Sequence, residues 1–312
     1  MPQHAKNGQI ENNFLKSPLA PRLALIIGIA AVSSGSVFVR LAQADAPSLA
    51  VAAYRLGLAA LILLFPAWLR YRNEIAGLKL SDWLWAFASG LFLAVHFASW
   101  ITSLEYTSVA SSVALVATSP LWVALFAWIA WREPLTRSLL TGLGLALAGS
   151  IVISFAEART AISPRPFLGN ALALAGALAV SGYWLIGRKL RRRISLVPYI
   201  TLVYGAAALI LLPTALALGR QLSGFQPATY GWFLLLALLP QLLGHSSFNW
   251  ALGHLPATFV AIATLGEPIG AAILALIFLG EIPSRLKMAA AAMILAGIYL
   301  AMVQRPGEPP RR

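Results

Sequence analysis

The chain has 312 residues, of which 59% are hydrophobic and only 11% are charged, and it contains no cysteine. Soluble globular domains carry about 25% charged residues, so this composition excludes an ordinary soluble protein, and the lack of cysteine excludes disulfides and thiolate metal sites. The net charge of +13 does not indicate nucleic-acid binding, because the basic residues lie in short segments between apolar runs, where orientation in a membrane explains them.

The hydrophobic residues form long runs along most of the chain. Each run has about 20 residues, which is enough to cross the bilayer core as a helix. A β-barrel would instead show alternating segments of about ten residues. We therefore predict an all-α polytopic membrane protein with ten transmembrane helices. The predicted spans are residues 21–40, 47–69, 82–104, 108–131, 137–156, 167–188, 196–218, 229–253, 256–280 and 284–303.

The two halves of the chain repeat one another. Residues 119–137, SPLWVALFAWIAWREPLTR, align with residues 267–285, EPIGAAILALIFLGEIPSR, at a constant offset of 148 residues. Because each half contains an odd number of spans, the second unit enters the membrane upside down relative to the first, as in many secondary transporters. The predicted parts are a cytoplasmic N-terminal segment (1–20), two inverted five-helix repeats (21–156 and 167–303) and a disordered cytoplasmic tail (304–312).

The distribution of Lys and Arg predicts the orientation in the membrane. If both termini are cytoplasmic, the inside segments carry sixteen of these residues and the outside segments carry six. Basic residues concentrate on the cytoplasmic side of membrane proteins, so we expect both termini in the cytoplasm. The run RKLRRR at 188–193 contributes most of this bias. It is interpreted as a topology anchor, and binding of anionic lipid is the alternative.

Near the end of each repeat, a proline is followed 13 residues later by a glutamate, at Pro120 and Glu133 and again at Pro268 and Glu281. With the stretches LEYTSVASSVALVATSPLWVALFAWIAWREPL and YRLGLAALILL, the sequence resembles the EamA-type branch of the drug/metabolite transporter superfamily over about residues 20–303. The resemblance implies a secondary transporter of the bacterial cytoplasmic (inner) membrane. Members of similar size include exporters of amino acids and related metabolites.

Ionisable residues inside the predicted spans are few. A charge at the bilayer centre costs on the order of 3 kcal/mol on insertion scales, so these side chains must face protein or water. They are Arg55, His96, His245 and Glu267.

Glu267 lies near the middle of a predicted span, at a position where the first repeat has a serine. Pro268 beside it cannot donate a backbone hydrogen bond, which predicts a kink, while Gly266 and Gly270 permit close helix packing. We interpret Glu267 as a residue that contacts substrate or a proton, with Arg55 as its ion-pair partner. The alternative is a structural role for either residue. The predicted helix hinges are Pro120 and Pro268.

A polar stripe runs along the predicted span 229–253. Gln241, His245 and Asn249 are four residues apart, so they fall on one face of an α-helix. They should line a cavity or make hydrogen bonds between helices. The predicted substrate pathway comprises His96, Trp100, Gln241, His245, Asn249, Glu267, Tyr54 and Trp184.

Enzyme motifs are missing from the sequence. There is no HExxH, GxSxG or Walker A pattern, so we expect neither an enzyme nor an ATP-driven pump, and no metal or other cofactor. We predict an exporter that moves a small amphipathic or zwitterionic metabolite, such as an amino acid, by alternating access. A channel-like facilitator, or an exporter of quaternary amines, drugs or sugars, is the alternative. The expected partners are this solute, the lipid bilayer and a proton as coupling ion, and the chain is expected to be a monomer or a weak dimer.

Overall fold

The computed structural model describes residues 19–131, 137–158, 164–255, 260, 263–264 and 266–302. Every regular element in these residues is a helix, which confirms the all-α prediction. The helices are α2 (Ala20–Ser33), α3 (Gly35–Gln43), α4 (Ser48–Ala76), α5 (Leu80–Tyr106), α6 (Val109–Val116), α7 (Ser119–Trp131), α8 (Arg137–Ala158), α9 (Pro166–Leu190), α10 (Leu196–Ala217), α11 (Pro227–Leu236), the π-helix η1 (Ala237–His245), α12 (Ser246–Ala251), α14 (Gly266–Leu279) and α15 (Arg285–Met302).

Seven helical segments of the described chain are long and apolar enough to cross a membrane. They are Ala20–Gln43, Ser48–Ala76, Leu80–Tyr106, Val109–Phe126, Pro166–Leu190, Leu196–Ala217 and Pro227–Ala251. The other three predicted spans coincide with α8, α14 and α15. The 14 residues of α14 extend only about 21 Å at 1.5 Å per residue, and most residues directly before it lie outside the described part. The count of ten spans therefore stays a prediction.

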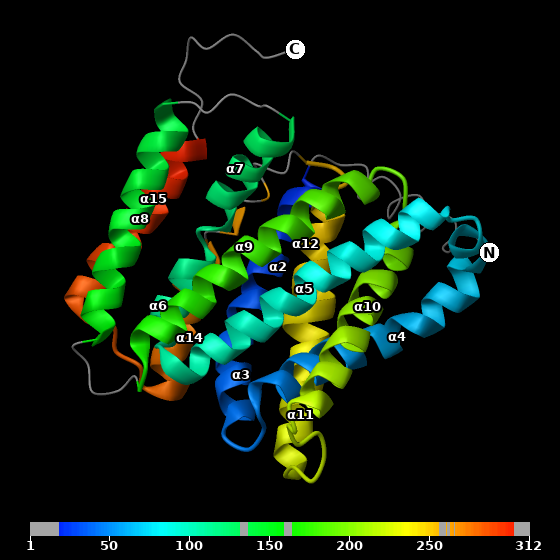
Figure 1. Cartoon of the computed structure of the whole chain (residues 1–312), viewed down its shortest axis with the longest axis horizontal. Helices are drawn as coiled ribbons and strands as arrows, with labels where there is room; N and C mark the ends of the chain where they lie inside the picture. The colour runs from blue at the N-terminus through cyan, green and yellow to red at the C-terminus, as the bar shows by residue number, and fades with distance from the viewer. Residues whose placement is uncertain are drawn as a thin grey trace, which may run out of the picture.

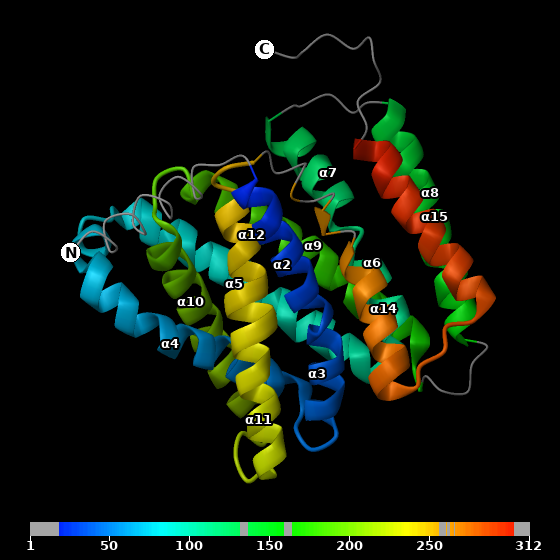
Figure 2. The same cartoon turned by 180° about the vertical axis from the view of Figure 1, so that it is seen from behind.

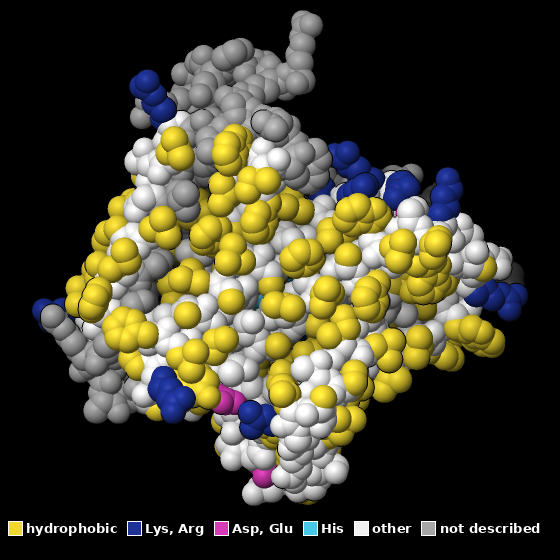
Figure 3. Space-filling view, in the orientation of Figure 1, with side chains coloured by type: hydrophobic (Ala, Val, Ile, Leu, Met, Phe, Trp, Pro, Cys, Tyr) yellow, Lys and Arg dark blue, Asp and Glu magenta, His cyan; other side chains and the backbone are white. Residues whose placement is uncertain are grey.

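The outer surface carries many large apolar side chains. Phe65 is 69% exposed and Leu209 is 72% exposed. Figure 3 shows such side chains spread over the face that α5, α9 and α10 form, with Lys and Arg gathered at its margins. Soluble monomers rarely expose apolar patches of more than a few hundred Å², so this surface fits lipid and supports a membrane protein.

The helices pack in long pairs. α8 lies against α15 at one edge of the bundle and α4 against α10 at the other (Figures 1 and 2). Between these pairs, α5 packs along α9, and α2 packs along η1 and α12. Glycines allow the backbones to approach closely. A Cβ added at Gly90 in α5, for example, would lie 2.6 Å from Cβ of Ala206 in α10.

Several spans are interrupted near their middle. α2 ends at Ser33 and α3 begins at Gly35, while Ala117 and Thr118 separate α6 from α7. In the span that contains η1, Pro240 lies inside the π-helical segment. Proline lacks an N–H group and clashes with the carbonyl four residues earlier, which disrupts the α-helical ladder. These interruptions leave irregular backbone in the centre of the bundle, around the site described next.

Candidate functional site

The interrupted helices surround a cavity between the two halves of the chain. Its volume is about 40 Å³, which is room for about two or three water molecules. Its polar lining comes from Arg55, His96, Ser119, His245, Thr264 and Glu267, and its aromatic lining from Trp100, Trp184 and Phe248. The cavity therefore combines both signs of charge with aromatic walls in a small volume.

Arg55 enters this cavity from α4 and is 1% exposed. Its Nε donates a 2.8 Å hydrogen bond to Oε1 of Gln241 in η1. The guanidinium carbon lies 4.2 Å from the ring centre of Phe97 and 5.6 Å from that of Trp100, contacts that stabilise a buried cation. Its Nη1 has no hydrogen-bond partner among the described residues. The guanidinium is thus held in place, but one of its hydrogen-bond donor groups has no acceptor.

Glu267 is the second residue of α14, so it lies at the partly positive end of that helix. Its backbone N–H donates to the carbonyl of Thr264 at 3.0 Å. Its carboxylate accepts no hydrogen bond from the described chain and forms no ion pair with Arg55, although both residues line the cavity. The ion pairs of the described chain are Arg40–Glu281 and Arg193–Asp82.

The two histidines lie beside aromatic rings in the same cavity. Nδ1 of His96 is 2.9 Å from the carbonyl oxygen of Gly176. Because a carbonyl only accepts, Nδ1 carries a proton in this contact. The ring of His96 is stacked parallel to that of Trp100, with centroids 6.1 Å apart, and the ring of His245 is 5.5 Å from that of Phe97.

The structure brings most of the predicted pathway residues together. The predicted residues that line the cavity are His96, Trp100, Trp184, His245 and Glu267. Gln241 lies behind the cavity wall, where it holds Arg55. Tyr54 lies elsewhere: it stacks on Phe233, with ring centroids 4.4 Å apart, and its hydroxyl donates to the carbonyl of Leu222. The transport role of each of these residues stays a prediction.

The predicted polar stripe is not one face of an α-helix, because residues 237–245 form the π-helix η1. The wider turn directs the three side chains to different partners. Gln241 contacts Arg55, and His245 faces the cavity. Nδ2 of Asn249 donates to the hydroxyl of Tyr183 at 2.7 Å.

The two predicted hinge prolines stand at helix starts. Pro120 is the second residue of α7 and Pro268 is the third residue of α14. In a first turn the missing N–H costs nothing, and the fixed φ angle favours the helix. Pro268 therefore lies in the first turn of α14. Most of the residues directly before α14 lie outside the described part of the chain, and its role as a hinge stays a prediction. The expected close packing is observed at Gly270, where an added Cβ would lie 2.8 Å from Cβ of Ser33.

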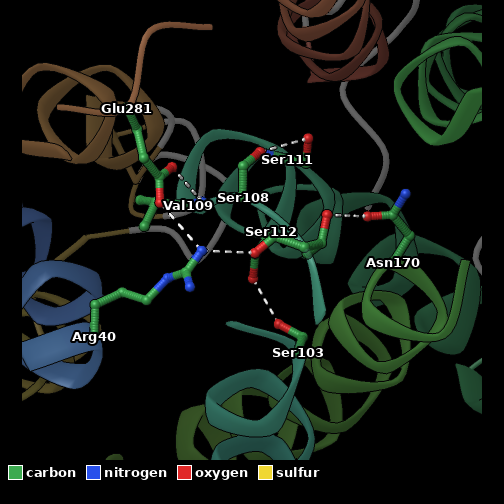
Figure 4. Close-up of polar contacts among 9 residues, drawn as sticks. Arg40, Ser103, Ser108, Val109, Ser111, Ser112, Asn170 and Glu281 are labelled. Carbon is green, nitrogen blue, oxygen red and sulfur yellow. Dashed lines mark hydrogen bonds and ion pairs between the residues drawn. The ribbon is translucent and has the colours of Figure 1, made fainter. Parts of the chain in front are cut away.

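A second polar group, the Arg40–Glu281 cluster, consists of Arg40, Thr107, Val109, Asn170 and Glu281. Figure 4 shows Arg40, Val109, Asn170 and Glu281 among its labelled residues. Nη2 of Arg40 lies 3.1 Å from Oε1 of Glu281 and donates to the carbonyl of Thr107 at 3.0 Å. Oε2 of Glu281 accepts from the N–H of Val109 at 2.9 Å, and the hydroxyl of Thr107 donates to Oδ1 of Asn170. These bonds join the two halves of the chain.

The Arg40–Glu281 cluster lies toward one end of the bundle from the cavity. α6 runs from Val109 in the cluster to Val116 beside the cavity, a distance of about 10 Å along the helix. α14 runs from Glu267 in the cavity to Leu279, two residues before Glu281. The orientation predicted from Lys and Arg places this end on the outside.

The cluster was not predicted from the sequence, although Arg40 and Glu281 each carry a signal. Arg40 closes the first apolar run, and Glu281 belongs to the Pro…Glu repeat motif. Both fall at the predicted outer ends of their spans with opposite charges, which could have paired them. The equivalent residue of the first repeat, Glu133, lies outside the described residues.

Comparison with known proteins identifies the family of this chain. The profile of the EamA-like transporter family matches residues 21–155 and 167–303. The uncharacterized transporter YwfM of Bacillus subtilis (strain 168) is 23% identical over 263 residues, covering 83% of this chain and 86% of YwfM. A probable terminal-alkyne amino-acid exporter of Streptantibioticus cattleyicolor is 24% identical over 186 residues, which cover 60% of this chain and 61% of that protein.

The fold also matches a solved structure. A crystal structure of another protein superposes with a TM-score of 0.64 at 17% identity, covering 91% of this chain and 97% of the other. The two family matches together span both halves of the chain, apart from its ends and the connection between the halves. This chain therefore belongs to the EamA-like transporter family, within the drug/metabolite transporter superfamily.

Proposed function

We propose that the protein exports a small amphipathic or zwitterionic metabolite of the amino-acid class across the inner membrane. It works by alternating access between two inverted five-helix units, residues 21–156 and 167–303. The observation that carries this proposal is that Arg55, which is buried, and Glu267, which is half-buried, line one cavity without forming an ion pair with each other. A zwitterion offers a complementary charge to each of them.

A contact that occurs twice supports the exchange of two related units. The hydroxyl of Ser33 in α2 lies 3.5 Å from the carbonyl oxygen of Glu267. The hydroxyl of Ser181 in α9 lies 2.9 Å from the carbonyl oxygen of Ser119 and 2.7 Å from that of Ala177, so its single proton is shared between them. Ser119 and Glu267 are equivalent in the repeat, and α2 and α9 each begin a predicted unit. The first helix of each unit thus touches the same place in the other unit, as inverted repeats allow.

The size of the cavity favours a carrier over a permanently open pore. At about 40 Å³, it holds only about two or three waters, so a metabolite requires the surrounding helices to move apart. The Arg40–Glu281 cluster ties those helices together at one end. The amino-acid class is supported by the related protein from Streptantibioticus cattleyicolor, which is named as a probable amino-acid exporter.

Counterflow in proteoliposomes tests the proposal. Purified protein is reconstituted with an unlabelled solute inside, and uptake of the labelled solute is followed for each L-amino acid, for glycine betaine and for glucose. We expect an amino acid inside to accelerate uptake of the same labelled amino acid. Uptake without such acceleration would indicate a channel-like facilitator, and acceleration by betaine or glucose alone would assign a different substrate class.

Thiol labelling tests the proposed orientation, with both termini in the cytoplasm. The chain has no cysteine, so each introduced cysteine is the sole target. Leu222→Cys, between α10 and α11, should react with a membrane-impermeant maleimide from outside intact cells. Arg192→Cys, between α9 and α10, should react only after permeabilisation. Reaction of Arg192→Cys with the maleimide in intact cells would contradict the proposed orientation and place both termini outside.

A further inference from the structure

Buried hydrogen-bond donors around the cavity lack acceptors. Nη1 of Arg55, Nε2 of Gln241 and Nε1 of Trp184 are all buried without a partner in the described chain. Native proteins leave few such groups unsatisfied, because each costs free energy when no partner replaces water. Glu267 supplies the one carboxylate among the described residues that line the cavity, and it does not pair with Arg55. The site therefore has more buried hydrogen-bond donors than acceptors.

The guanidinium of Arg55 is oriented with one edge occupied and one edge free. Gln241 accepts from Nε at 2.8 Å, and the ring of Phe97 covers one face at 4.2 Å. Nη1, on the other edge, has no protein acceptor among the described residues. A carboxylate fits such an edge with two parallel hydrogen bonds, which is the strongest geometry available to an arginine.

We propose that Arg55, oriented by Gln241, binds the carboxylate of the transported solute, while Glu267 binds its ammonium group. This inference rests on the proposed function and narrows it, because a free carboxylate becomes a requirement for recognition. Amines, quaternary amines without a carboxylate and sugars are then poor ligands. The walls formed by Trp100 and Trp184 receive the apolar part of the solute.

A purely structural Arg55 is the competing explanation. In that case the guanidinium only braces α4 against η1 through Gln241, and recognition does not depend on a carboxylate. The two explanations differ in how the protein ranks analogues of one amino acid. Its methyl ester and amide keep the ammonium group and lose the carboxylate, whereas its N-acetyl derivative keeps the carboxylate and loses the ammonium group.

Competition binding to the purified full-length protein in detergent measures this ranking without leakage of analogues through a membrane. The labelled probe is the L-amino acid with the largest counterflow signal. We expect its methyl ester and amide to bind about tenfold to a hundredfold more weakly than the amino acid, as for the loss of charge-assisted hydrogen bonds. An ester and amide that compete as well as the amino acid would overturn the inference.

Two variants assign the effect to the residue. Arg55→Gln should lower the affinity for the amino acid to that for its ester and leave the affinity for the ester unchanged. The affinity of Arg55→Lys for the amino acid should lie between those of the wild type and Arg55→Gln, because lysine keeps the positive charge but cannot make two parallel hydrogen bonds to a carboxylate. Glu267→Gln is the matched control: it should retain the preference for acid over ester and lose the preference for the free amine over its N-acetyl form. If Arg55→Gln loses the same amount of affinity for the amino acid and for its ester, Arg55 has only a structural role.

The outcomes separate this inference from the proposed function. If the wild-type protein shows no amino-acid counterflow, both fail together. If amino acids exchange but the ester and amide bind equally well, only the role of Arg55 fails. The wild-type ranking decides the matter even if Arg55→Gln does not fold.

Discussion

The cavity and the Arg40–Glu281 cluster contain the same kinds of charged group in opposite arrangements. In the cluster, the carboxylate of Glu281 meets both Arg40 and the N–H of Val109. In the cavity, Arg55 and Glu267 line the same small volume but do not form an ion pair with each other. A paired, hydrogen-bonded charge holds helices together, whereas a buried charge without an ion-pair partner is costly, which is why we propose a solute as the partner in the cavity.

In the proposed transport cycle, the two regions have different parts. The cluster joins helices of both predicted units at one end, so we propose that it is a closure that breaks when that end opens. We propose that a solute supplies the missing partners in the cavity. Variants of the cavity should therefore change affinity and coupling, and variants of the cluster should change which side of the cavity is accessible.

The largest effect is expected from Glu267→Gln, which keeps the shape of the side chain and removes its charge. The affinity for the transported amino acid should fall about tenfold to a hundredfold, because a charge-assisted hydrogen bond is lost. If Glu267 also carries the coupling proton, the variant should still exchange substrate for substrate but lose its response to a pH gradient. Counterflow and gradient-driven transport in proteoliposomes measure both.

Glu105→Gln provides the matched control for this change, because Glu105 contacts Ser48 at the end of α5 and does not line the cavity. It should transport like the wild type. Should Glu267→Gln also transport like the wild type at every pH and concentration, the acid in the cavity is structural and the contrast between the two regions disappears.

A smaller effect is expected from opening the cluster with Glu281→Ala. Arg40 and the N–H of Val109 then lose their shared acceptor. Loss of about 1–2 kcal/mol from the closed state shifts the balance between closed and open forms by about fivefold to thirtyfold. Ala117→Cys, a cavity position, reports this shift as faster reaction with an impermeant thiol reagent from outside intact cells.

The matching control for labelling is Glu105→Ala, which removes an acid of α5 that is not part of the cluster. Its labelling rate should equal that of Ala117→Cys alone. An unchanged rate in Glu281→Ala would mean that other contacts close this end of the bundle.

The sequence predicted the fold class and the charged part of the cavity for one physical reason. Moving a charge into an apolar span is expensive whatever its partners, so ionisable residues within the spans mark protein-facing positions. All of them line the cavity: Arg55, His96, His245 and Glu267. The same reasoning needs no knowledge of helix packing, which is why it succeeds without a structure.

Partners and helix breaks could not be predicted in the same way. The π-helical turn around Pro240 changes the direction of Gln241, and no simple residue pattern distinguishes it from an ordinary kink. The break at Ala117 and Thr118 has no glycine or proline within it. Tyr54 was predicted in the pathway together with His96 and the other residues, but it packs on Phe233 outside the cavity, and side chains of adjacent helical residues such as Tyr54 and Arg55 point in different directions.

Ser33→Ala and Ser181→Ala test whether the two units are equivalent. Each should lower the counterflow rate by about a few-fold, as for the loss of one hydrogen bond. Each removes a hydroxyl that contacts the carbonyl at the start of α14 or α7. Since the contacts are equivalent in the repeat, both variants should slow counterflow, and Ser181→Ala should slow it more because its 2.9 Å bond is shorter than the 3.5 Å contact of Ser33. An effect confined to Ser33→Ala would argue against exchange between equivalent units.

The smallest effect on transport is expected from Tyr54→Phe. Tyr54 packs on Phe233 and donates to the carbonyl of Leu222, and it does not line the cavity. Removing the hydroxyl should lower the free energy of unfolding by about 1 kcal/mol, seen as a lower thermal midpoint in detergent, while substrate affinity stays unchanged. Trp100→Phe is the contrasting variant, because Trp100 lines the cavity beside Arg55 and its substitution should weaken binding. If Tyr54→Phe weakens binding as much as Trp100→Phe, the pathway extends beyond the cavity to Tyr54, as predicted from the sequence.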